Sequence, residues 1–310
     1  MKFLSRILAI VALAVAATAC GPKAHAQDKL IVATGDVKGG STYAIMGQEL
    51  INVCGKGDVT AFPTTGGGTT NRTLLVDNKV SMALLQSDML EFTRRNDPDK
   101  VKNIRTLVNL HKEEIHFIAR ADVKKEGGYA FGIGAKSVAF NSLADLTGRT
   151  VGAVGGSVDS ANVISKNSGL NFAVQRFNDN ETLSAALLEG KLDAIVVVAG
   201  APSAMVAKLP ASFKLLPIPK EVSQKLVESK LYSPAKLSYE NLRATGVDTV
   251  AVQSVIATRV YRSAGTLDKL KAFRSCFYNK LGDIQDARGT HPKWQDVDGE
   301  LKTGWQWYDL

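Results

Sequence analysis

The feature that most constrains this fold is a unit of buried strand, polar glycine-bearing loop and amphipathic helix that recurs along the chain. In residues 64–88, TTGGGTTNRTLLVDNKVSMALLQSD, the pattern predicts a loop, a helix from Thr70 to Asn78 and a buried strand from Met82 to Leu85. Loop glycines let a ligand approach the backbone closely, and the helix N-terminus behind them offers free N–H groups to an anion. An ordinary turn between a strand and a helix uses the same residue types, so one such loop alone does not indicate a binding site.

The first half of the chain contains this unit twice in succession. A continuous apolar run from Lys29 to Thr34 predicts a strand buried on both faces, and Val59 to Phe62 predicts the next strand. Between them, residues 42–54 place apolar side chains at three- and four-residue spacings, which is typical of the buried stripe of a helix. Strands that alternate with helices over short connections predict a parallel sheet with right-handed crossovers.

The second half repeats the plan from Ser142 onward. We expect helices at 156–167 and 181–189, and strands at Thr150 to Val154, Phe172 to Arg176, Asp193 to Val198 and Phe213 to Ile218. The third of these strands ends in a glycine turn, and Pro202 just past the turn suits the first turn of a helix. Two similar sheets, each with glycine loops at one edge, predict two lobes around a cleft.

Two further strands are expected to join the lobes. Glu114 to Arg120 carries the chain out of the first lobe after a separate strand at Ile104 to Leu110, and Val250 to Arg259 carries it back. The mature chain then divides into lobe I, residues 27–117 with 253–310, and lobe II, residues 118–252.

Three other segments complete the predicted organisation. The glycine-rich stretch 124–136 is interpreted as an exposed hairpin or loop. Residues 266–281 carry an apolar stripe at helical spacing and are interpreted as a core helix. The aromatic tail 304–308 is expected to pack against lobe I.

The N-terminus resembles an export signal. Lys2 and Arg6 precede an apolar run, residues 7–17, that is too short to span a bilayer. Cleavage after Ala26 removes residues 1–26, and a lipid anchor at Cys20 is the alternative. Either route predicts a protein outside the cytoplasm, in the periplasm.

Composition excludes some function classes. Removing residues 1–26 takes away three basic and no acidic residues, so the formal net charge of +8 falls by three. This mild positive charge, without a dense basic run interleaved with aromatics, gives no indication of nucleic-acid binding. Cys54 and Cys276 remain, either as a disulfide or as two separate buried thiols.

A search for reactive groups finds none at workable spacing. The chain has no H-E-x-x-H pattern, no Cys-x-x-Cys pair and no G-x-S-x-G elbow, so we expect no metal, no cofactor and no catalysis. The acidic pair Glu113-Glu114 is interpreted as a solvated face or strand entry rather than an acid and base.

Four polar, glycine-bearing loops remain, at 39–43, 64–71, 155–160 and 199–202. Backbone N–H, hydroxyl and amide groups without a reactive group are typical of a binding site for a small polar solute. The residues expected to contact the solute are Gly40, Ser41, Thr42, Tyr43, Thr65, Gly66, Gly67, Asn71, Gln86, Ser87, Asp88, Gly156, Ser157, Ser160, Gly200 and Pro202.

The runs ATGDVKGGSTYAIMGQEL, PTTGGGTTNRTLL, ALLQSD, LADLTGRTVGAVGGS and GKLDAIVVVAGAP resemble the TAXI family of solute receptors for tripartite ATP-independent periplasmic (TRAP) transporters. The resemblance implies an α/β, two-lobed type II periplasmic-binding-protein fold, each lobe a mainly parallel sheet flanked by helices, with the ligand cleft between them. It also implies a monomer that captures a small organic anion or amino acid, such as glutamate or a related dicarboxylate, and delivers it to the TRAP permease.

Roles for individual side chains follow from this resemblance. Tyr43 is expected to form an aromatic wall, Thr65, Asn71 and Gln86 to donate or accept hydrogen bonds, and Ser157 and Ser160 to grip a carboxylate, with Arg72 or Lys38 as the counter-charge. Gly68 with Thr69-Thr70 departs from the usual serine and acidic approach to the asparagine, and the insertion around 129–134 departs as well. A sensory receptor that feeds a membrane kinase, or a periplasmic enzyme on the same fold, are the alternative functions.

Overall fold

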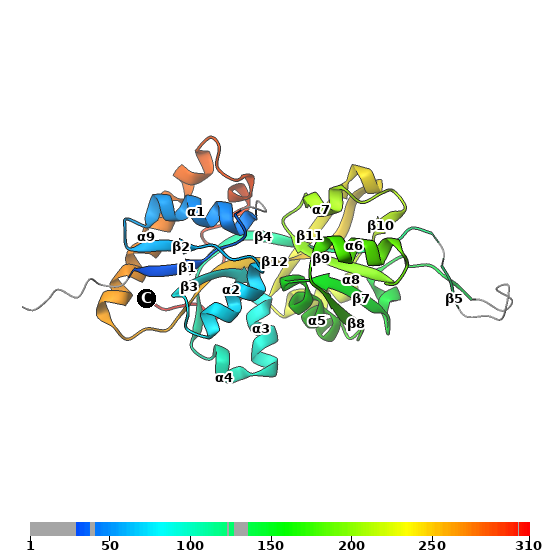
Figure 1. The fold of residues 1–310 in the computed structure, drawn as a ribbon, viewed down its shortest axis with the longest axis horizontal. Helices are drawn as coiled ribbons and strands as arrows, with labels where there is room; N and C mark the ends of the chain where they lie inside the picture. Colours follow the sequence, from blue (N-terminus) through cyan, green and yellow to red (C-terminus); the bar gives the residue numbers. More distant parts are fainter. Residues whose placement is uncertain (1–28, 38–40, 123, 127–135, 303) are drawn as a thin grey trace, which may run out of the picture.

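The structure, a computed structural model, describes residues 29–37, 41–122, 124–126, 136–302 and 304–310. Its elements gather into two groups joined by the long strands β4 (Ile104–Arg120) and β12 (Ala244–Arg259) (Figure 1). We call the group that holds the N-terminal strands lobe I and the other group lobe II. None of the helices in the described ranges is long and apolar enough to cross a membrane. The predicted signal peptide and the alternative anchor at Cys20 lie outside the described residues.

Lobe I contains a parallel sheet in which β1 lies between β2 and β3. Its first elements are β1 (Leu30–Ala33), α1 (Thr42–Cys54), β2 (Val59–Phe62), α2 (Gly67–Val76), β3 (Met82–Gln86), α3 (Ser87–Asn96) and α4 (Pro98–Val101). The predicted bounds of α1 and β2 are confirmed. The helix α2 starts at Gly67 instead of the predicted Thr70, because the last loop residues form its first turn.

The strands β4 and β12 make one continuous sheet of both lobes. β12 pairs with β3 in lobe I and with β11 in lobe II, while β4 pairs with β12, β9 and β10. The prediction of two strands separated near residue 112 is wrong, because Lys112 and Glu113 stay paired with Gln253 and Val252 of β12. β12 starts at Ala244 instead of Val250, because its first residues pair with β11.

Lobe II repeats the arrangement, with β7 between β8 and β9. Its elements are η2 (Leu143–Leu146), β7 (Thr150–Val154), α5 (Gly156–Ser168), β8 (Ala173–Phe177), α6 (Asn180–Leu188), β9 (Ala194–Ala199), α7 (Ala204–Ala207), β10 (Phe213–Leu215), α8 (Lys220–Glu228), β11 (Tyr232–Tyr239) and η3 (Glu240–Leu242). The expectation that Pro202 enters a first helical turn is wrong, because α7 begins only at Ala204.

Between residues 218 and 244 no element was predicted, so α8, β11 and η3 have no counterpart among the predicted elements. β11 contains Pro234, which cannot donate to a strand ladder, and the strand accordingly lies at an edge of the described sheet, paired with β12. β5 (Lys124–Glu126) and β6 (Lys136–Val138) pair antiparallel at the far end of lobe II (Figure 1), so the predicted hairpin is confirmed at its base. The insertion around 129–134 lies outside the described residues.

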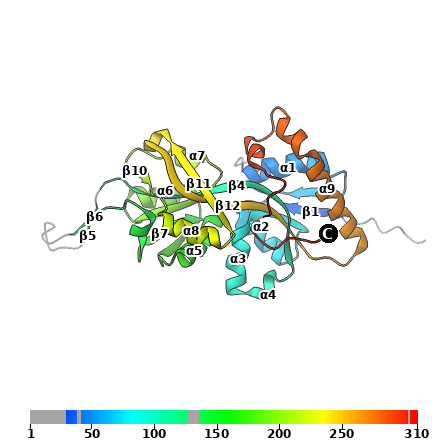
Figure 2. The same ribbon diagram turned by 180° about the vertical axis from the view of Figure 1, so that it is seen from behind.

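Separate apolar cores support the two lobes. In lobe I, Leu50 of α1 packs with Phe273 and Phe277 of α9 (Ala264–Asp286), which lies along α1 behind the sheet (Figure 2). A disulfide between Cys54 and Cys276 joins the same two helices. The remaining element, η4 (Pro292–Asp296), leads into the aromatic tail, which packs on lobe I as expected.

Candidate functional site

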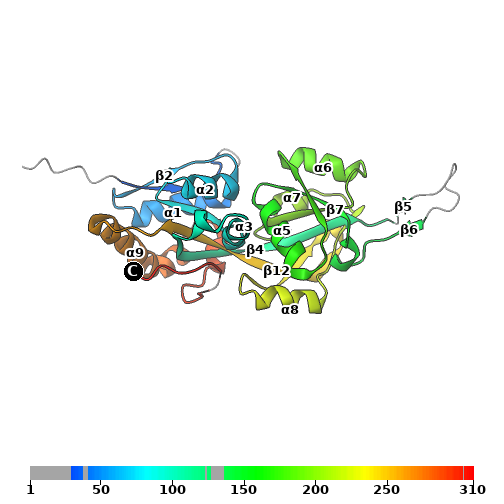
Figure 3. The same ribbon diagram turned by 90° about the horizontal axis from the view of Figure 1, so that it is seen from below.

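The two lobes meet where α2, α3 and α5 begin. An added Cβ on Gly156 at the start of α5 would lie 2.4 Å from Gln86 Oε1, and one on Gly68 of α2 would lie 3.0 Å from the same oxygen. The helices α3 and α5 lie side by side at this boundary (Figure 3). The side chain of Gln86 therefore lies between the first turns of one helix from each lobe, and the cleft between the lobes is closed.

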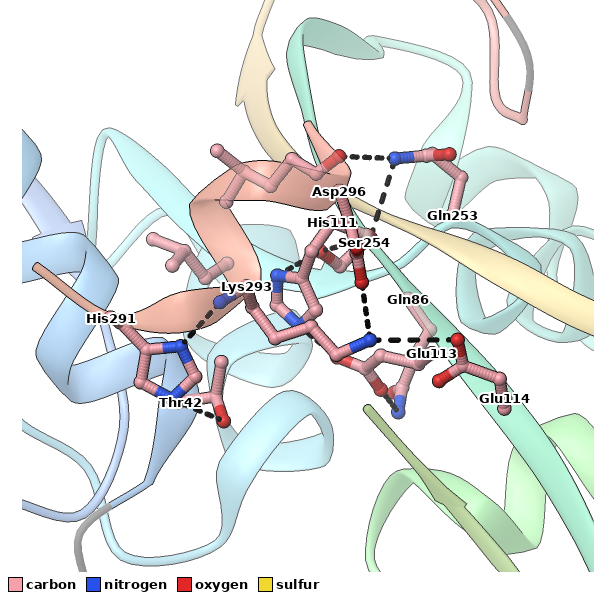
Figure 4. Close-up of polar contacts among 12 residues, drawn as sticks. Thr42, Gln86, His111, Glu113, Glu114, Gln253, Ser254, His291, Lys293 and Asp296 are labelled. Atoms are coloured by element: carbon pink, nitrogen blue, oxygen red, sulfur yellow. Dashed lines mark hydrogen bonds and ion pairs between the residues drawn. The ribbon is translucent and has the colours of Figure 1, made fainter. Parts of the chain in front are cut away.

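Behind this contact, a buried polar network joins the C-terminal end of β3 to the middle of β4 and β12 (Figure 4). Gln86 Nε2 donates to Glu113 Oε2 at 2.6 Å, and His111 Nε2 lies 3.4 Å from Glu113 Oε1. Ser254, which pairs with Gln86 across the sheet, donates its hydroxyl to the His111 carbonyl at 2.9 Å. All four residues are buried, so this network belongs to the interior of the closed cleft.

Tyr43 of α1 closes one side of the network. Its ring meets the His111 ring edge-on at 6.0 Å between centroids. Burial, followed by the Glu113 carboxylate, raises the pKa of the Tyr43 hydroxyl well above its usual value. That hydroxyl makes no hydrogen bond within the described chain. We call Tyr43, Gln86, His111 and Glu113 the interlobe cluster.

Asp88 lies beside the cluster at the start of α3 and is fully buried. Tyr232 of lobe II donates its hydroxyl to Asp88 Oδ2 at 2.7 Å, whereas the Ser160 hydroxyl lies near the carboxyl group without a hydrogen bond of good geometry to Asp88 Oδ1. Burial raises the pKa of Asp88 to about 7, although the hydroxyls of Tyr232 and Ser160 act in the opposite direction. Asp88 is thus a carboxyl group desolvated by contact between the lobes.

A cluster of charged side chains, Lys293 with Glu114 and Asp296, lies next to Glu113. Lys293 Nζ from η4 reaches to 3.5 Å from Glu114 Oε1 (Figure 4) and also contacts Asp296, while Glu114 Oε2 accepts from Ala201 N at 2.6 Å. The stem of Lys293 crosses Gly200 so closely that an added Cβ there would lie 2.5 Å from its Cε. A side chain at 200 would therefore displace the lysine.

The anchoring of η4 explains how Lys293 is held there. The carboxylate of Glu49 on α1 accepts from His291 N at 3.0 Å and from Trp294 Nε1 at 2.6 Å. Trp294 is fully buried in the core of lobe I. Lobe I therefore presents Lys293 from a fixed segment to lobe II.

Other polar contacts also span the boundary. Arg72 of α2 forms an ion pair with Asp159 of α5, which is fully buried and also lies 3.7 Å from Arg176. Arg95 of α3 donates to Asn167 at 2.7 Å. The Arg72 side chain, predicted as a ligand counter-charge, is therefore engaged by Asp159, and Lys38 lies outside the described residues.

The family is shown by comparison with family models. The model of the NMT1-like family matches residues 32–271. The chain belongs to the NMT1-like family. None of the curated proteins compared with this NMT1-like chain matches it.

Two solved structures are similar to this NMT1-like protein in fold. Protein AF1704 from Archaeoglobus fulgidus is 12% identical, with a TM-score of 0.51, over 89% of this chain and 86% of that one. Tv2483, solved bound to L-arginine, is also 12% identical, with a TM-score of 0.51, over 87% of this chain and 92% of that one. With similar halves of one sheet in the two lobes, joined by two crossing strands, the chain has the predicted two-lobed type II periplasmic-binding-protein fold.

Some of the residues predicted from the sequence lie inside the closed cleft of this NMT1-like protein. They are Tyr43, Gln86, Asp88, Gly156, Ser160 and, through its backbone, Gly200. The loop residues Thr65, Gly66 and Pro202 are exposed, while Ser41 and Gly67 are partly exposed, and Gly40 lies outside the described residues.

Three predicted residues have polar partners within the fold, and a fourth, Ser87, packs against the tail without a hydrogen bond from its hydroxyl. Asn71 holds strands β1 and β3 together by donating to the carbonyls of Thr34 and Leu84, and it accepts from Thr64 at 2.6 Å. Ser157 accepts from Val198 N at 3.0 Å, and Thr42 lies 3.5 Å from His291. Ser87 lies against Gly304 of the tail.

Five residues at the boundary were not predicted as site residues from the sequence, namely His111, Glu113, Glu114, Tyr232 and Lys293. The interpretation of Glu113-Glu114 as a solvated face is wrong, because Glu113 is 5% exposed and the Glu114 side chain is only 15% exposed. A continuous strand through residue 112 could have suggested burial, but no local pattern places Lys293 beside Glu114. Within the described ranges no three histidine, cysteine or acidic side chains form a metal site.

Proposed function

We propose that this NMT1-like protein is an extracytoplasmic receptor that captures a small polar solute between its lobes. One observation carries the proposal: buried polar atoms without hydrogen bonds converge from both lobes on the closed boundary. They include Tyr43 Oη, Gln86 Oε1, Asp88 Oδ1 and Ser160 Oγ. Buried polar atoms are normally satisfied, so unsatisfied ones gathered at one place favour a ligand there.

The fold supports a mechanism of closure around the solute. The strands β4 and β12 are the only sheet connections between the described lobes, and we propose that they bend as the hinge. In the open form, the side chains at the starts of α2, α3 and α5 face solvent, so solute can enter. Solute shifts the balance toward the closed form by binding that form more tightly.

The finer assignments rest on the sequence resemblance. We propose that the protein is a TAXI-type receptor, exported to the periplasm, that works as a monomer and hands its solute to a TRAP permease. We keep the lobe boundaries at residues 27–117 with 253–310 and at 118–252. Among the solutes implied, an amino acid suits the site better than a dicarboxylate, because the buried carboxylate of Glu113 would repel a second acid.

Retention of a metabolite tests the proposal. The mature protein, incubated with a small-molecule extract and desalted, is expected to release one chemically unchanged solute on denaturation, detected by mass spectrometry. Gln86→Ala should lose most of that solute, whereas the exposed Gln224→Ala on α8 should retain it. A wild-type protein that retains no solute, or that releases a converted product, contradicts a receptor function.

A further inference from the structure

We infer that the interlobe cluster is a subsite for a cationic nitrogen, so that the solute carries an ammonium or guanidinium group held by Glu113, His111 and Tyr43. This inference rests on the proposed receptor function and names the chemical class of the solute. It replaces the expectation of a dicarboxylate with that of an amine-bearing solute.

Glu113 has no lysine or arginine partner in the described chain. Its described polar partners are neutral groups or a histidine, namely Gln86 Nε2 at 2.6 Å and His111 Nε2 at 3.4 Å. Two other acidic groups at the boundary have cationic partners, Asp159 with Arg72 and Glu114 with Lys293, whereas Asp88 accepts from the neutral Tyr232. A carboxylate removed from water is costly unless a cation compensates it, and beside a neutral His111 the solute is the remaining source of one.

The hydrogen bonds of Ser254 indicate which ring nitrogen of His111 carries a proton. Ser254 donates its single hydroxyl proton to the His111 carbonyl, so its oxygen must accept from His111 Nδ1 at 3.2 Å. This network places a proton on Nδ1, and the neutral imidazole then presents Nε2 as an acceptor. Nε2 then faces the Glu113 carboxylate, which also only accepts, and has no hydrogen-bond partner in the described chain. Two acceptors that face each other favour a donor from a third molecule.

The Tyr43 hydroxyl is a third polar group close to Glu113. It is buried, faces the Glu113 carboxylate from α1 closely enough for an attractive contact, and its oxygen accepts no hydrogen bond in the described structure. A hydroxyl can accept as well as donate, so Glu113, His111 Nε2 and Tyr43 Oη provide three acceptors for the three N–H donors of an ammonium group. The number and direction of these acceptors fit a primary amine.

The local charge excludes the opposite assignment. A dicarboxylate would need a free cation, but Lys293 is engaged by Glu114 and Asp296, and Arg72 by Asp159. Asp88, which lies close enough to Glu113 for their charges to interact, adds a second acidic group. A carboxylate on the solute has a favourable position at the first turns of α2 and α5, because the backbone N–H groups that start a helix have no partner within it.

A matched set of probes tests the inference. The mature protein is titrated by calorimetry with L-lysine, L-arginine and putrescine, and in parallel with succinate and 2-oxoglutarate, which lack nitrogen. At least one amine should bind and neither nitrogen-free acid should. Glu113→Gln should weaken that amine by at least about tenfold and Tyr43→Phe by a smaller factor of about three, whereas the exposed Glu228→Gln should bind like wild type.

The outcomes separate this inference from the receptor function. Binding of a nitrogen-free acid, failure of all three amines, or unchanged amine affinity in Glu113→Gln overturns the cationic subsite. A nitrogen-free acid that binds leaves the receptor function intact, and only the loss of all solute retention from extract contradicts that function. Tyr43→Phe removes one oxygen only, so it keeps the test decisive if Glu113→Gln does not fold.

Discussion

Single residues at the boundary between the lobes divide into those that hold the fold and those that are free for a solute. Asn71 belongs to the first kind, since both its amide protons and its oxygen bind groups of lobe I. Gln86 belongs to the second, since its oxygen has no partner in the described chain. The same type of polar side chain at a strand end therefore serves two purposes, and only the tertiary contacts distinguish them.

Replacing Asn71 tests the structural role. Asn71→Ala leaves buried carbonyls of Thr34 and Leu84 without a donor, so the free energy of unfolding should fall by about 1–3 kcal/mol. The exposed Asn52→Ala is the matched control and should change it little. Urea denaturation measures both. An Asn71→Ala protein of wild-type stability that no longer binds solute would show instead that Asn71 contacts the ligand.

The site could be predicted only in part from the sequence, for a reason visible at single residues. Tyr43, Gln86, Asp88 and Ser160 follow strand ends in the repeating unit, where parallel strands bring their carboxyl ends to one edge. Glu113 lies in the middle of a strand, and Lys293 lies 179 positions from its partner Glu114, so neither belongs to a local pattern.

At the scale of elements, the start of α3 couples proton binding to contact between the lobes. Closure buries Asp88 between α3, α5 and β11, where its pKa is raised to about 7 from an ordinary value of 3.8. Tyr232 faces it from β11, Asp159 from α5, Glu113 from β4 and Tyr43 from α1. The closed form is therefore more stable with the Asp88 carboxyl protonated than with it charged, because burial removes the water that would stabilise the charge.

The sign of the pH effect follows from this shift. Because the pKa is higher in the closed form, closure takes up a proton, and it is favoured below about pH 4 and progressively disfavoured as pH rises to about 7. The open population should rise by up to about tenfold per pH unit in that window. Small-angle scattering should give a larger radius of gyration at pH 7.5 than at pH 5.5.

Asp88→Asn isolates this group. The variant should show the same radius of gyration at both pH values, whereas the exposed Asp248→Asn should behave like wild type. An unchanged pH response in Asp88→Asn would assign the effect to another titrating group.

The helices α1 and α9 give a second prediction at this scale. Their disulfide closes a loop with a sequence separation of 222. Reducing it therefore increases the conformational entropy of the unfolded chain and favours unfolding. Dithiothreitol should lower the free energy of unfolding by about 2–4 kcal/mol. A Cys54→Ser, Cys276→Ser double variant is the control and should not respond to the reductant. Equal stability of wild type with and without reductant would contradict this role.

The order of elements was more predictable than the site. The bounds predicted for α1, β2 and β7 from apolar runs and helical stripes are the observed ones, because the local pattern and the burial in the fold agree there. α8 and β11 went unpredicted, since β11 contains Pro234 and is stabilised by its pairing with β12 rather than by its own pattern.

At the scale of the whole molecule, polar contacts hold the lobes together across the boundary. Arg72 compensates the buried Asp159, so Arg72→Ala leaves that carboxylate close only to the half-exposed Arg176. The closed form should lose stability relative to the open form, where Asp159 regains water. We expect a larger radius of gyration without solute and weaker solute binding, by about tenfold or more. Arg262→Ala, outside the boundary, is the control, and a compact Arg72→Ala protein with wild-type affinity contradicts the prediction.

The central claim is that the solute lies between the lobes, against the interlobe cluster. A crystal structure of the mature protein with the solute identified by mass spectrometry tests this claim most directly. The account predicts solute density bounded by Tyr43, Gln86 and Glu113 of lobe I and by the start of α5 in lobe II. Density elsewhere, for example in the open cavity of about 820 Å³ between α8 and β11, with the interlobe cluster unchanged, would contradict it.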